Sequence, residues 1–288
     1  MVSQATIETR PATLPGTEEI RESWSRIADG YDEFITPTHT WLGEEGLRRA
    51  GLRPGMRFLD VAAGSGALSI PAARLGARVL ATDLSPQMLA RLEARARKEG
   101  LAVETRVMDG HDLELEDGIF DLAGSQFGVM LFPDMPRGVR ELARVTKPGG
   151  RVLMNVFGDP RKVEFFGFFI AALQAAAPAF EGPPMDPPPL PFQLQDPEAL
   201  RSELAKAGLK DIRVETVSEK LECSSGTALW DWLLHSNPIV GAILGELNLA
   251  PSKLGVISAT LERMVRSRAG AGGTAVLTAP INIGVGTK

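Results

Sequence analysis

The 288-residue sequence has little of what builds metal sites and disulfides. Its only cysteine is Cys223, which excludes an internal disulfide framework and every zinc site that uses several cysteines. The three histidines, His39, His111 and His235, are scattered along the chain without metal-ligand spacing. We therefore predict a protein without a metal centre.

Positive charge and long apolar runs are scarce as well. Lysine and arginine total 31 against 36 acidic residues, a formal net charge of −5, which argues against nucleic acid as a partner. No uninterrupted apolar run approaches the roughly 20 residues that span a bilayer. Residues 1–16 are polar and lack the apolar core of a signal peptide. The sequence predicts a cytoplasmic chain without a membrane span, which starts with a flexible tail over residues 1–16.

Helices come first, and strands then alternate with helices. Apolar spacing predicts two helices within the N-terminal segment 17–55, and Thr36-Pro37 is expected to interrupt the helical structure between them. Five strands alternate with helices in the core segment 56–158. This alternation predicts βαβ units and a doubly wound, mostly parallel α/β sheet. The strands are expected over residues 56–61, 78–82, 102–108, 120–125 and 151–157.

The second half of the chain mixes a cap with the end of this core. Residues 159–196 contain an apolar aromatic helix and a proline-rich stretch that cannot form a regular helix or a central strand, and residues 225–268 contain further helices. We predict that these two segments form an α-helical cap over the carboxyl edge of the sheet. Residues 197–224 and 269–288 are expected to supply one more core helix and two strands.

A nucleotide-type pocket is predicted where the first strand ends. Asp60 closes that strand and leads through Ala62 into Gly64 and Gly66. The missing Cβ atoms of the glycines let a ligand lie against the backbone. The helix that follows directs free N–H groups and the positive end of its dipole at the ligand. In a doubly wound sheet such ligands bind outside the carboxyl ends of the strands.

Two more acidic residues follow the neighbouring strands. Asp83 ends the second strand about twenty residues beyond the glycines, where a carboxylate can accept both hydroxyls of a ribose. Asp109, followed by Gly110 and His111, ends the third strand, where a carboxylate can accept from the exocyclic amine of a base. The apolar side chains that flank these acids and could sandwich an adenine ring are Leu84, Met88 and Met108.

Two cofactor classes use such a pocket. A nicotinamide dinucleotide requires G-x-G-x-x-G, but Ser69 stands at the third glycine position and the charge of Asp60 opposes a diphosphate. S-adenosyl-L-methionine has a ribose, an adenine and a cationic amino-acid tail without phosphate, so it fits better. Asp60 then helps to hold the ammonium group, and the turn at residues 64–66 admits the methionine portion.

Five stretches, in order and spacing, resemble the motifs of class I S-adenosylmethionine-dependent methyltransferases. They are most similar to the small-molecule branch that includes the ubiquinone and menaquinone biosynthesis enzymes. The resemblance covers roughly residues 56–157, and it departs from many members at Leu68, where they carry a further glycine. The stretches are LDVAAGSGALSI, ATDLSPQML, VMDGHDL, FDLAGSQFGVMLF and ELARVTKPGGRVLMNVFG.

The resemblance implies a Rossmann-like sheet of seven strands, the last antiparallel, and it assigns roles within the cofactor site. Gly64 and Gly66 contact the methionine moiety, Asp83 the ribose and Asp109 the adenine amine. Ser125, in the loop after the fourth strand, faces cofactor and substrate. The remaining expected cofactor contacts are Asp60, Ala62, Leu84, Met88, Gly110 and His111.

Methyl transfer from a sulfonium is an in-line displacement, which needs a general base only when the acceptor must lose a proton. His235, in a predicted cap helix, is the first candidate for that base, and His39 is a weaker one. Tyr31, the only tyrosine, lies in the segment that closes over the cofactor in this family, and we expect it to contact cofactor or substrate. The aromatic and apolar cap residues that could line an acceptor pocket are Phe165, Phe166, Phe169, Met185, Phe192, Trp230, Trp232 and Leu233.

The leading hypothesis is a metal-free methyltransferase that acts at O, N or C of a small apolar or aromatic acceptor. Two alternatives stay open: a protein or enzyme that binds S-adenosylmethionine without transferring its methyl group, and an NAD(P)-dependent oxidoreductase. The sequence does not decide whether the chain forms a homo-oligomer.

Overall fold

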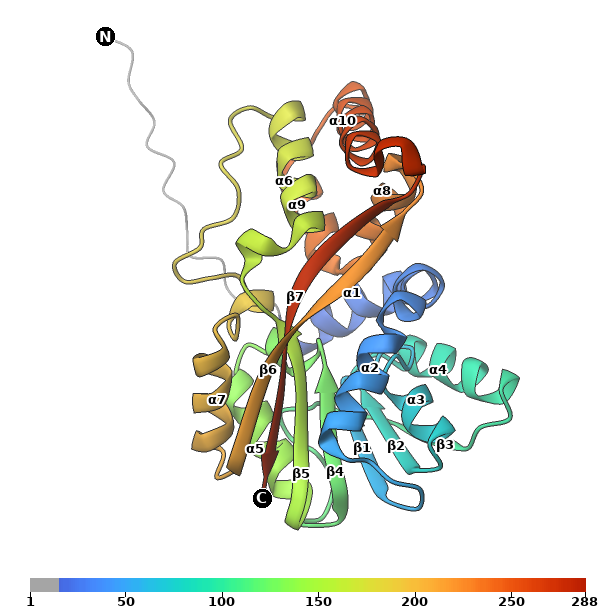
Figure 1. Cartoon of the computed structure of the whole chain (residues 1–288), viewed down its shortest axis with the longest axis vertical. Coiled ribbons are helices and arrows are strands. Elements are labelled where there is room, and N and C mark those ends of the chain that lie inside the picture. Colours follow the sequence, from blue (N-terminus) through green and yellow to red (C-terminus); the bar gives the residue numbers. More distant parts are fainter. Residues whose placement is uncertain (1–15) are drawn as a thin grey trace.

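Seven strands form one sheet in the order β3-β2-β1-β4-β5-β7-β6 in the computed structural model, which describes residues 16–288 (Figure 1). The predicted tail of residues 1–16 therefore lies outside the described residues, except for its last residue. Strands β1 to β5 are parallel to one another, and β7 is antiparallel to both of its neighbours, which confirms the predicted sheet. The strands are β1 (Arg57–Val61), β2 (Arg78–Asp83), β3 (Val103–Val107), β4 (Phe120–Gln126), β5 (Thr146–Phe157), β6 (Lys210–Cys223) and β7 (Ala275–Thr287).

The helices follow the local signals of the sequence. The Ser85 hydroxyl accepts a hydrogen bond from the Met88 N–H, and Pro86 opens the helix, as expected for a capped N-terminus. The α-helices are α1 (Thr17–Gly30), α2 (Thr36–Ala50), α3 (Ser69–Arg74), α4 (Pro86–Lys98), α5 (Met135–Val145), α6 (Glu164–Ala176), α7 (Pro197–Lys206), α8 (Gly226–Ser236), α9 (Pro238–Leu247) and α10 (Pro251–Ala269).

The predicted interruption at Thr36-Pro37 is wrong. A single π-helical turn, Tyr31–Ile35, connects α1 to α2, and the chain stays helical throughout. Proline lacks an N–H and its ring opposes the carbonyl four residues before it, but both are tolerated in the first turn of a helix. Pro37 stands in the first turn of α2, and the π turn before it absorbs the irregularity. Tyr31 is the first residue of this turn.

The cap stands on an arm made of the two last strands. The pairing of β5 with β7 ends at Phe157 opposite Ile281, whereas residues 218–223 of β6 continue to pair with residues 275–280 of β7. Figure 1 shows this arm rising out of the sheet toward α6, α8, α9 and α10. The side chains buried between arm and cap helices, including Leu221, Trp232 and Leu261, form a core separate from that of the sheet.

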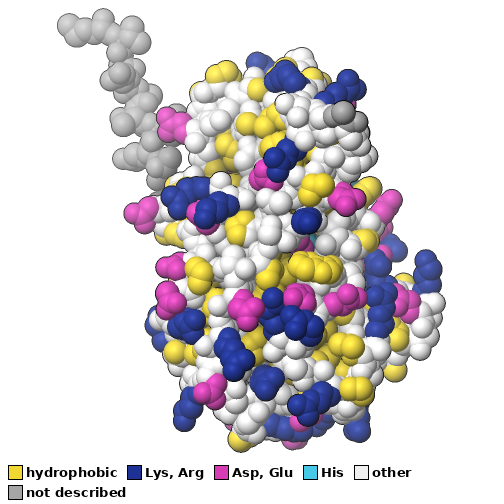
Figure 2. Space-filling model, viewed as in Figure 1, with side chains coloured by type: hydrophobic (Ala, Val, Ile, Leu, Met, Phe, Trp, Pro, Cys, Tyr) yellow, Lys and Arg dark blue, Asp and Glu magenta, His cyan; other side chains and the backbone are white. Residues whose placement is uncertain are grey.

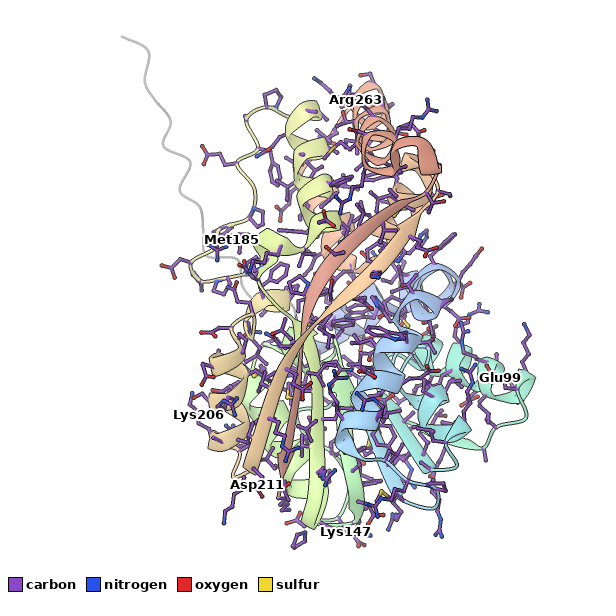
Figure 3. The ribbon with its side chains drawn as sticks, viewed as in Figure 1. Glu99, Lys147, Met185, Lys206, Asp211 and Arg263 are labelled. Atoms are coloured by element: carbon purple, nitrogen blue, oxygen red, sulfur yellow. The ribbon has the colours of Figure 1, made fainter. Side chains whose placement is uncertain are left out.

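The visible surface mixes both signs of charge. On the face drawn in Figure 2, basic and acidic side chains are interspersed and the hydrophobic ones lie in small patches. Figure 3 places Met185 on the proline-rich loop beside α6, at the outside of the molecule, where its side chain is 42% exposed. Within residues 16–288, no helix is both long and apolar enough to cross a bilayer.

Candidate active site

A cavity of about 430 Å³ lies at the carboxyl ends of β1, β2 and β3. It adjoins the boundary between β1 and β4, where the strand order reverses and ligands of doubly wound sheets bind. Its volume is in the range of small-molecule sites, roughly 300–1,000 Å³. The predicted residues on its wall are Tyr31, Ala62, Gly64, Asp83, Leu84, Met88, Met108, Asp109, Gly110 and His111.

The turn after β1 has the backbone geometry that the glycines predict. Gly64 has φ 54° and lines the cavity, where a Cβ would lie 3.6 Å from the Tyr31 ring. Gly66 has φ 101° and is not on the cavity wall. A Cβ there would approach Leu92 to 3.0 Å, so Gly66 is needed for the packing of α4 on the turn. Ala62 also has a positive φ of 56°, a strained conformation that concentrates at functional sites.

Asp60 lies behind the cavity wall and lacks one hydrogen bond. The Ser69 hydroxyl donates to its Oδ2 atom at 2.6 Å, while its Oδ1 atom is buried without a partner among the described residues. Burial raises the pKa of Asp60 to about 7. The negative charge of Asp83 also raises this pKa, whereas the hydrogen bond from Ser69 lowers it. A buried acceptor without a donor is rare, and a ligand that donates hydrogen bonds can complete it.

Asp83 is held rigidly at the end of β2. Its two carboxylate oxygens accept from the N–H of Gly64 and from the N–H of Ser85, each at 2.8 Å. Burial raises the pKa of Asp83, and these backbone bonds oppose the shift. Since each oxygen keeps a second lone pair, the carboxylate can still accept two hydroxyl groups from the cavity.

Asp109 holds His111 at the far end of the cavity. Its Oδ1 atom accepts from the His111 N–H at 2.9 Å and lies 2.7 Å from His111 Nδ1. The His111 ring packs on Phe132 with centroids 4.4 Å apart. The Oδ2 atom of Asp109 has no hydrogen-bond partner within residues 16–288, which leaves an acceptor for a base amine.

The residues of the loop after β4 that line the cavity differ from the one predicted from the sequence. Ser125 is 2% exposed, and its hydroxyl accepts from the Val129 N–H at 3.0 Å, so it fixes the loop from inside. Gln126, Phe127 and Gly128 line the cavity instead. Phe127 has φ 58°, which is unusual for a residue with a side chain, and no sequence pattern predicts it.

The N-terminal segment closes the cavity. Trp24 and Tyr31 lie on its wall with ring centroids 5.9 Å apart, edge to face. Ser25 shares a hydrogen bond of 2.8 Å with Ser85, and Asp32 pairs with Arg95, so α1 and the π turn are fixed to α4. Burial, with the charges of Asp83 and Glu219, raises the pKa of the Tyr31 phenol, which therefore stays protonated at neutral pH.

A second, apolar cavity of about 120 Å³ adjoins the first under the cap. Trp24, Tyr31 and Phe127 belong to the walls of both cavities. The cap side chains that we expected in an acceptor pocket and that do line this cavity are Phe165, Phe166, Phe169, Phe192, Trp232 and Leu233. Met185 and Trp230 do not line it.

The histidines are arranged differently from the prediction. His235 is on the wall of neither cavity: its Nδ1 donates to the Asp231 carbonyl at 2.8 Å, and its ring stacks on Phe34 with centroids 5.2 Å apart. This placement does not favour its predicted role as a base. His39 is buried on the wall of the apolar cavity, with Nδ1 2.8 Å from Glu219 Oε1.

Comparisons with known proteins agree with this architecture. Residues 59–154 match the model of a family described as "Methyltransferase domain". The uncharacterized protein Rv1405c of Mycobacterium tuberculosis (strain ATCC 25618 / H37Rv) is 40% identical over 140 residues, 49% of this chain and 50% of that protein. The chain thus aligns with about half the length of the first curated relatives. The demethylmenaquinone methyltransferase of Mycolicibacterium gilvum is 29% identical over 225 residues, 74% of this chain and 92% of that protein.

Solved structures extend the likeness of fold to nearly the whole chain. The crystal structure of the cyclase SpnF covers 95% of this chain and 96% of that one, with a TM-score of 0.56 and 15% identity. Together these findings confirm the predicted resemblance to class I S-adenosylmethionine-dependent methyltransferases. They also support S-adenosylmethionine as the cofactor.

Proposed function

We propose that the chain is a methyltransferase that transfers a methyl group from S-adenosyl-L-methionine to a small apolar or aromatic acceptor. The observation that carries the proposal is the pair of adjoining cavities, one lined by the acids of three strand ends and one lined by aromatic side chains. The residues that line both cavities, Trp24, Tyr31, Phe127 and Leu131, mark the place where a donor methyl group and an acceptor can meet.

The residues of the larger cavity fit S-adenosylmethionine. Asp83 would accept the ribose hydroxyls, and Asp109 would accept the adenine amine through its free oxygen. Asp60, whose buried Oδ1 atom lacks a donor, would attract the ammonium group through its charge from behind the cavity wall. A diphosphate at the glycine turn would instead lie near the charge of Asp60, so the nicotinamide alternative is disfavoured.

When bound, the cofactor supplies an electrophilic methyl group on a sulfonium. The protein's contribution is alignment and exclusion of water, which can supply several kcal/mol of a displacement barrier. The rings of Phe127 and Trp24 keep the junction of the cavities apolar. The neutral Tyr31 hydroxyl offers a hydrogen-bond donor there without the charge of a phenolate.

The acceptor class is supported by the cap. Aromatic walls and a small volume suit a planar apolar molecule, and the similarity to a demethylmenaquinone methyltransferase points to an aromatic ring with oxygen substituents. The alternative function keeps cofactor binding and lacks methyl transfer. A cytoplasmic location and a reaction without a metal stay predictions from the sequence. Self-association stays open.

The test is a transfer assay with the full chain. Cofactor labelled in the methyl group is incubated with separate panels of phenols, quinols, amines and indoles, and the label is followed into the organic products. Labelled product from any panel supports the proposal. Tight cofactor binding with no labelled product from any panel would favour the alternative, and no cofactor binding would contradict both.

A further inference from the structure

The buried pair of His39 and Glu219 lies beside the acceptor cavity and has no role in the cofactor site. Nδ1 and Oε1 are 2.8 Å apart, and both side chains are 6% exposed. Within residues 16–288, His39 is the one hydrogen-bonding or ionic partner of the Glu219 carboxylate. Burying a carboxylate without a lysine or arginine costs several kcal/mol.

Glu219 also stands on a face of its strand that is otherwise apolar along the arm. Along the arm, residues 219, 221 and 223 of β6 point to the buried side, and the other two are Leu221 and Cys223. Glu219 pairs with Ala279 just beyond the end of β5, where the arm leaves the sheet. The carboxylate therefore stands at the boundary between sheet and cap, behind the acceptor cavity.

This pair determines which nitrogen of His39 is free. A carboxylate only accepts, so the neutral imidazole donates its Nδ1–H to Glu219 and keeps a lone pair on Nε2. Nε2 has no hydrogen-bond partner in the described part of the chain. The ring lies on the cavity wall with its centroid 4.9 Å from that of Phe127 and 6.2 Å from that of Trp232. An oriented, basic nitrogen thus borders an otherwise apolar space.

We propose that His39 is the general base of the reaction, that Glu219 positions it, and that the acceptor is an aromatic alcohol such as a phenol or quinol. This inference rests on the proposed methyltransferase function. An aromatic hydroxyl becomes a strong nucleophile only when it loses its proton. An amine, by contrast, attacks through a neutral lone pair and can release its proton after the transfer.

For such an acceptor, the reaction moves one proton and one methyl group. His39 Nε2 takes the hydroxyl proton, and the acceptor oxygen forms the new bond to the methyl carbon. The electron pair of the broken carbon–sulfur bond stays on sulfur, which leaves S-adenosylhomocysteine. Glu219 stabilises the imidazolium until the proton passes to solvent. If a ring carbon attacks instead, tautomerisation returns the ring proton to oxygen.

Few other titratable groups face this histidine. Lys220 of β6 lines a narrow space behind the pair together with His39 and Glu219, and Tyr31 of the π turn borders the acceptor cavity as a neutral phenol. The side chains that α6, α8 and the loop after β4 present to the cavity beside His39 are Phe165, Trp232 and Phe127. Glu219 is thus the dominant charge at the ring.

A spectroscopic probe tests the base directly. The full chain is saturated with S-adenosylhomocysteine and titrated with 4-nitrophenol, whose ionised form absorbs visible light. His39→Asn keeps an N–H for Glu219 and removes the basic nitrogen. We expect the ratio of ionised to neutral bound probe at a fixed acidic pH to be at least about tenfold lower in His39→Asn than in the wild type. Glu219→Gln, which keeps the oxygen and removes the charge, should lie between them.

His235→Asn is the matched control, because His235 is a helix histidine on neither cavity wall, and it should behave as the wild type does. Transfer to unsubstituted phenol, which is almost entirely protonated at neutral pH, should be about 10²- to 10⁴-fold slower in His39→Asn than in the wild type at pH 7 and should recover as the pH rises. If His39→Asn does not fold, Glu219→Gln is compared with the wild type instead.

Several results would overturn the inference. Unchanged ionisation of the bound probe in both variants, with a loss of thermal stability, would reduce the pair to a structural link between α2 and the arm. Failure of 4-nitrophenol to bind the loaded wild type would exclude the acceptor class. A wild type that binds neither S-adenosylhomocysteine nor S-adenosylmethionine would overturn the proposed function itself, which cofactor calorimetry distinguishes from the other two outcomes.

Discussion

Asp60 should make cofactor binding depend on pH. Its carboxyl is 1% exposed, and burial raises its pKa to about 7 in the free protein. The ammonium group of S-adenosylmethionine would pair with the ionised form, which is about half of the molecules at pH 7 and about one in a hundred at pH 5. The dissociation constant should therefore rise by up to about 50-fold between these pH values.

The variant Asp60→Asn separates this effect from other effects of low pH on the protein. It removes the titrating group and keeps an oxygen that can accept from Ser69. We expect weaker binding than the wild type at pH 7 and a much flatter pH dependence, measured by calorimetry or by the fluorescence of Trp24, which lines the cavity. Equal slopes in the two proteins, or no slope in the wild type, would refute the assignment of Asp60 to the ammonium group.

The raised pKa of Asp60 should also make the stability of the free protein depend on pH. The folded pKa of Asp60, about 7, lies above its ordinary value of 3.8. Its contribution to stability is therefore complete below pH 3.8 and is lost as the pH rises through about 7. At pH 8, Asp60→Asn should be more stable than the wild type without ligand, by at most about 4 kcal/mol. A lower unfolding temperature for the variant at pH 8 would contradict the raised pKa.

Three further substitutions test the other parts of the site. Asp83→Ala should weaken S-adenosylmethionine binding about 10- to 100-fold in calorimetry, since hydrogen bonds to a charged group are lost; unchanged affinity would rule out the ribose contact. Tyr31→Phe should lower the methylation rate or the cofactor affinity by about tenfold at most, and no change in either would remove Tyr31 from the site. Gly66→Ala should destabilise the fold by about 1–3 kcal/mol in urea unfolding, because φ is 101° and Leu92 is 3.0 Å from the added Cβ; wild-type stability would show that the turn relaxes freely.

Much of the sheet and of the cofactor cavity is predictable because its signals are local. Asp83 is the last residue of β2 and Asp109 stands two residues after β3, and parallel strands bring such ends to one edge. The capping residue Ser85 and the left-handed Gly64 likewise act within a few residues of themselves. These features need no knowledge of the rest of the fold.

The acceptor side was predicted less well because it depends on distant segments. His39 and Glu219 are 180 residues apart, and no periodicity links them. A local signal did exist, since Glu219 shares the inward face of β6 with Leu221 and Cys223. His235 is the first candidate base in the sequence and His39 the weaker one, but the His235 helix face turns toward Gly30, where only a residue without a Cβ fits beneath the ring.

The N-terminal segment shows a different kind of failure. The interpretation of Pro37 as a break is wrong, because Pro37 stands in the first turn of α2, where proline is tolerated. The π turn that accommodates it has no sequence signature of its own. It is nevertheless what places Tyr31 between the two cavities.

The central claim is that the cavity beside β1 holds S-adenosylmethionine, and calorimetry of the full chain with this ligand and with NADH tests it most directly. The acids at the three strand ends predict saturable binding of one S-adenosylmethionine per chain, with Asp83→Ala much weaker and no heat of binding from NADH. Binding of NADH without binding of S-adenosylmethionine would contradict the account.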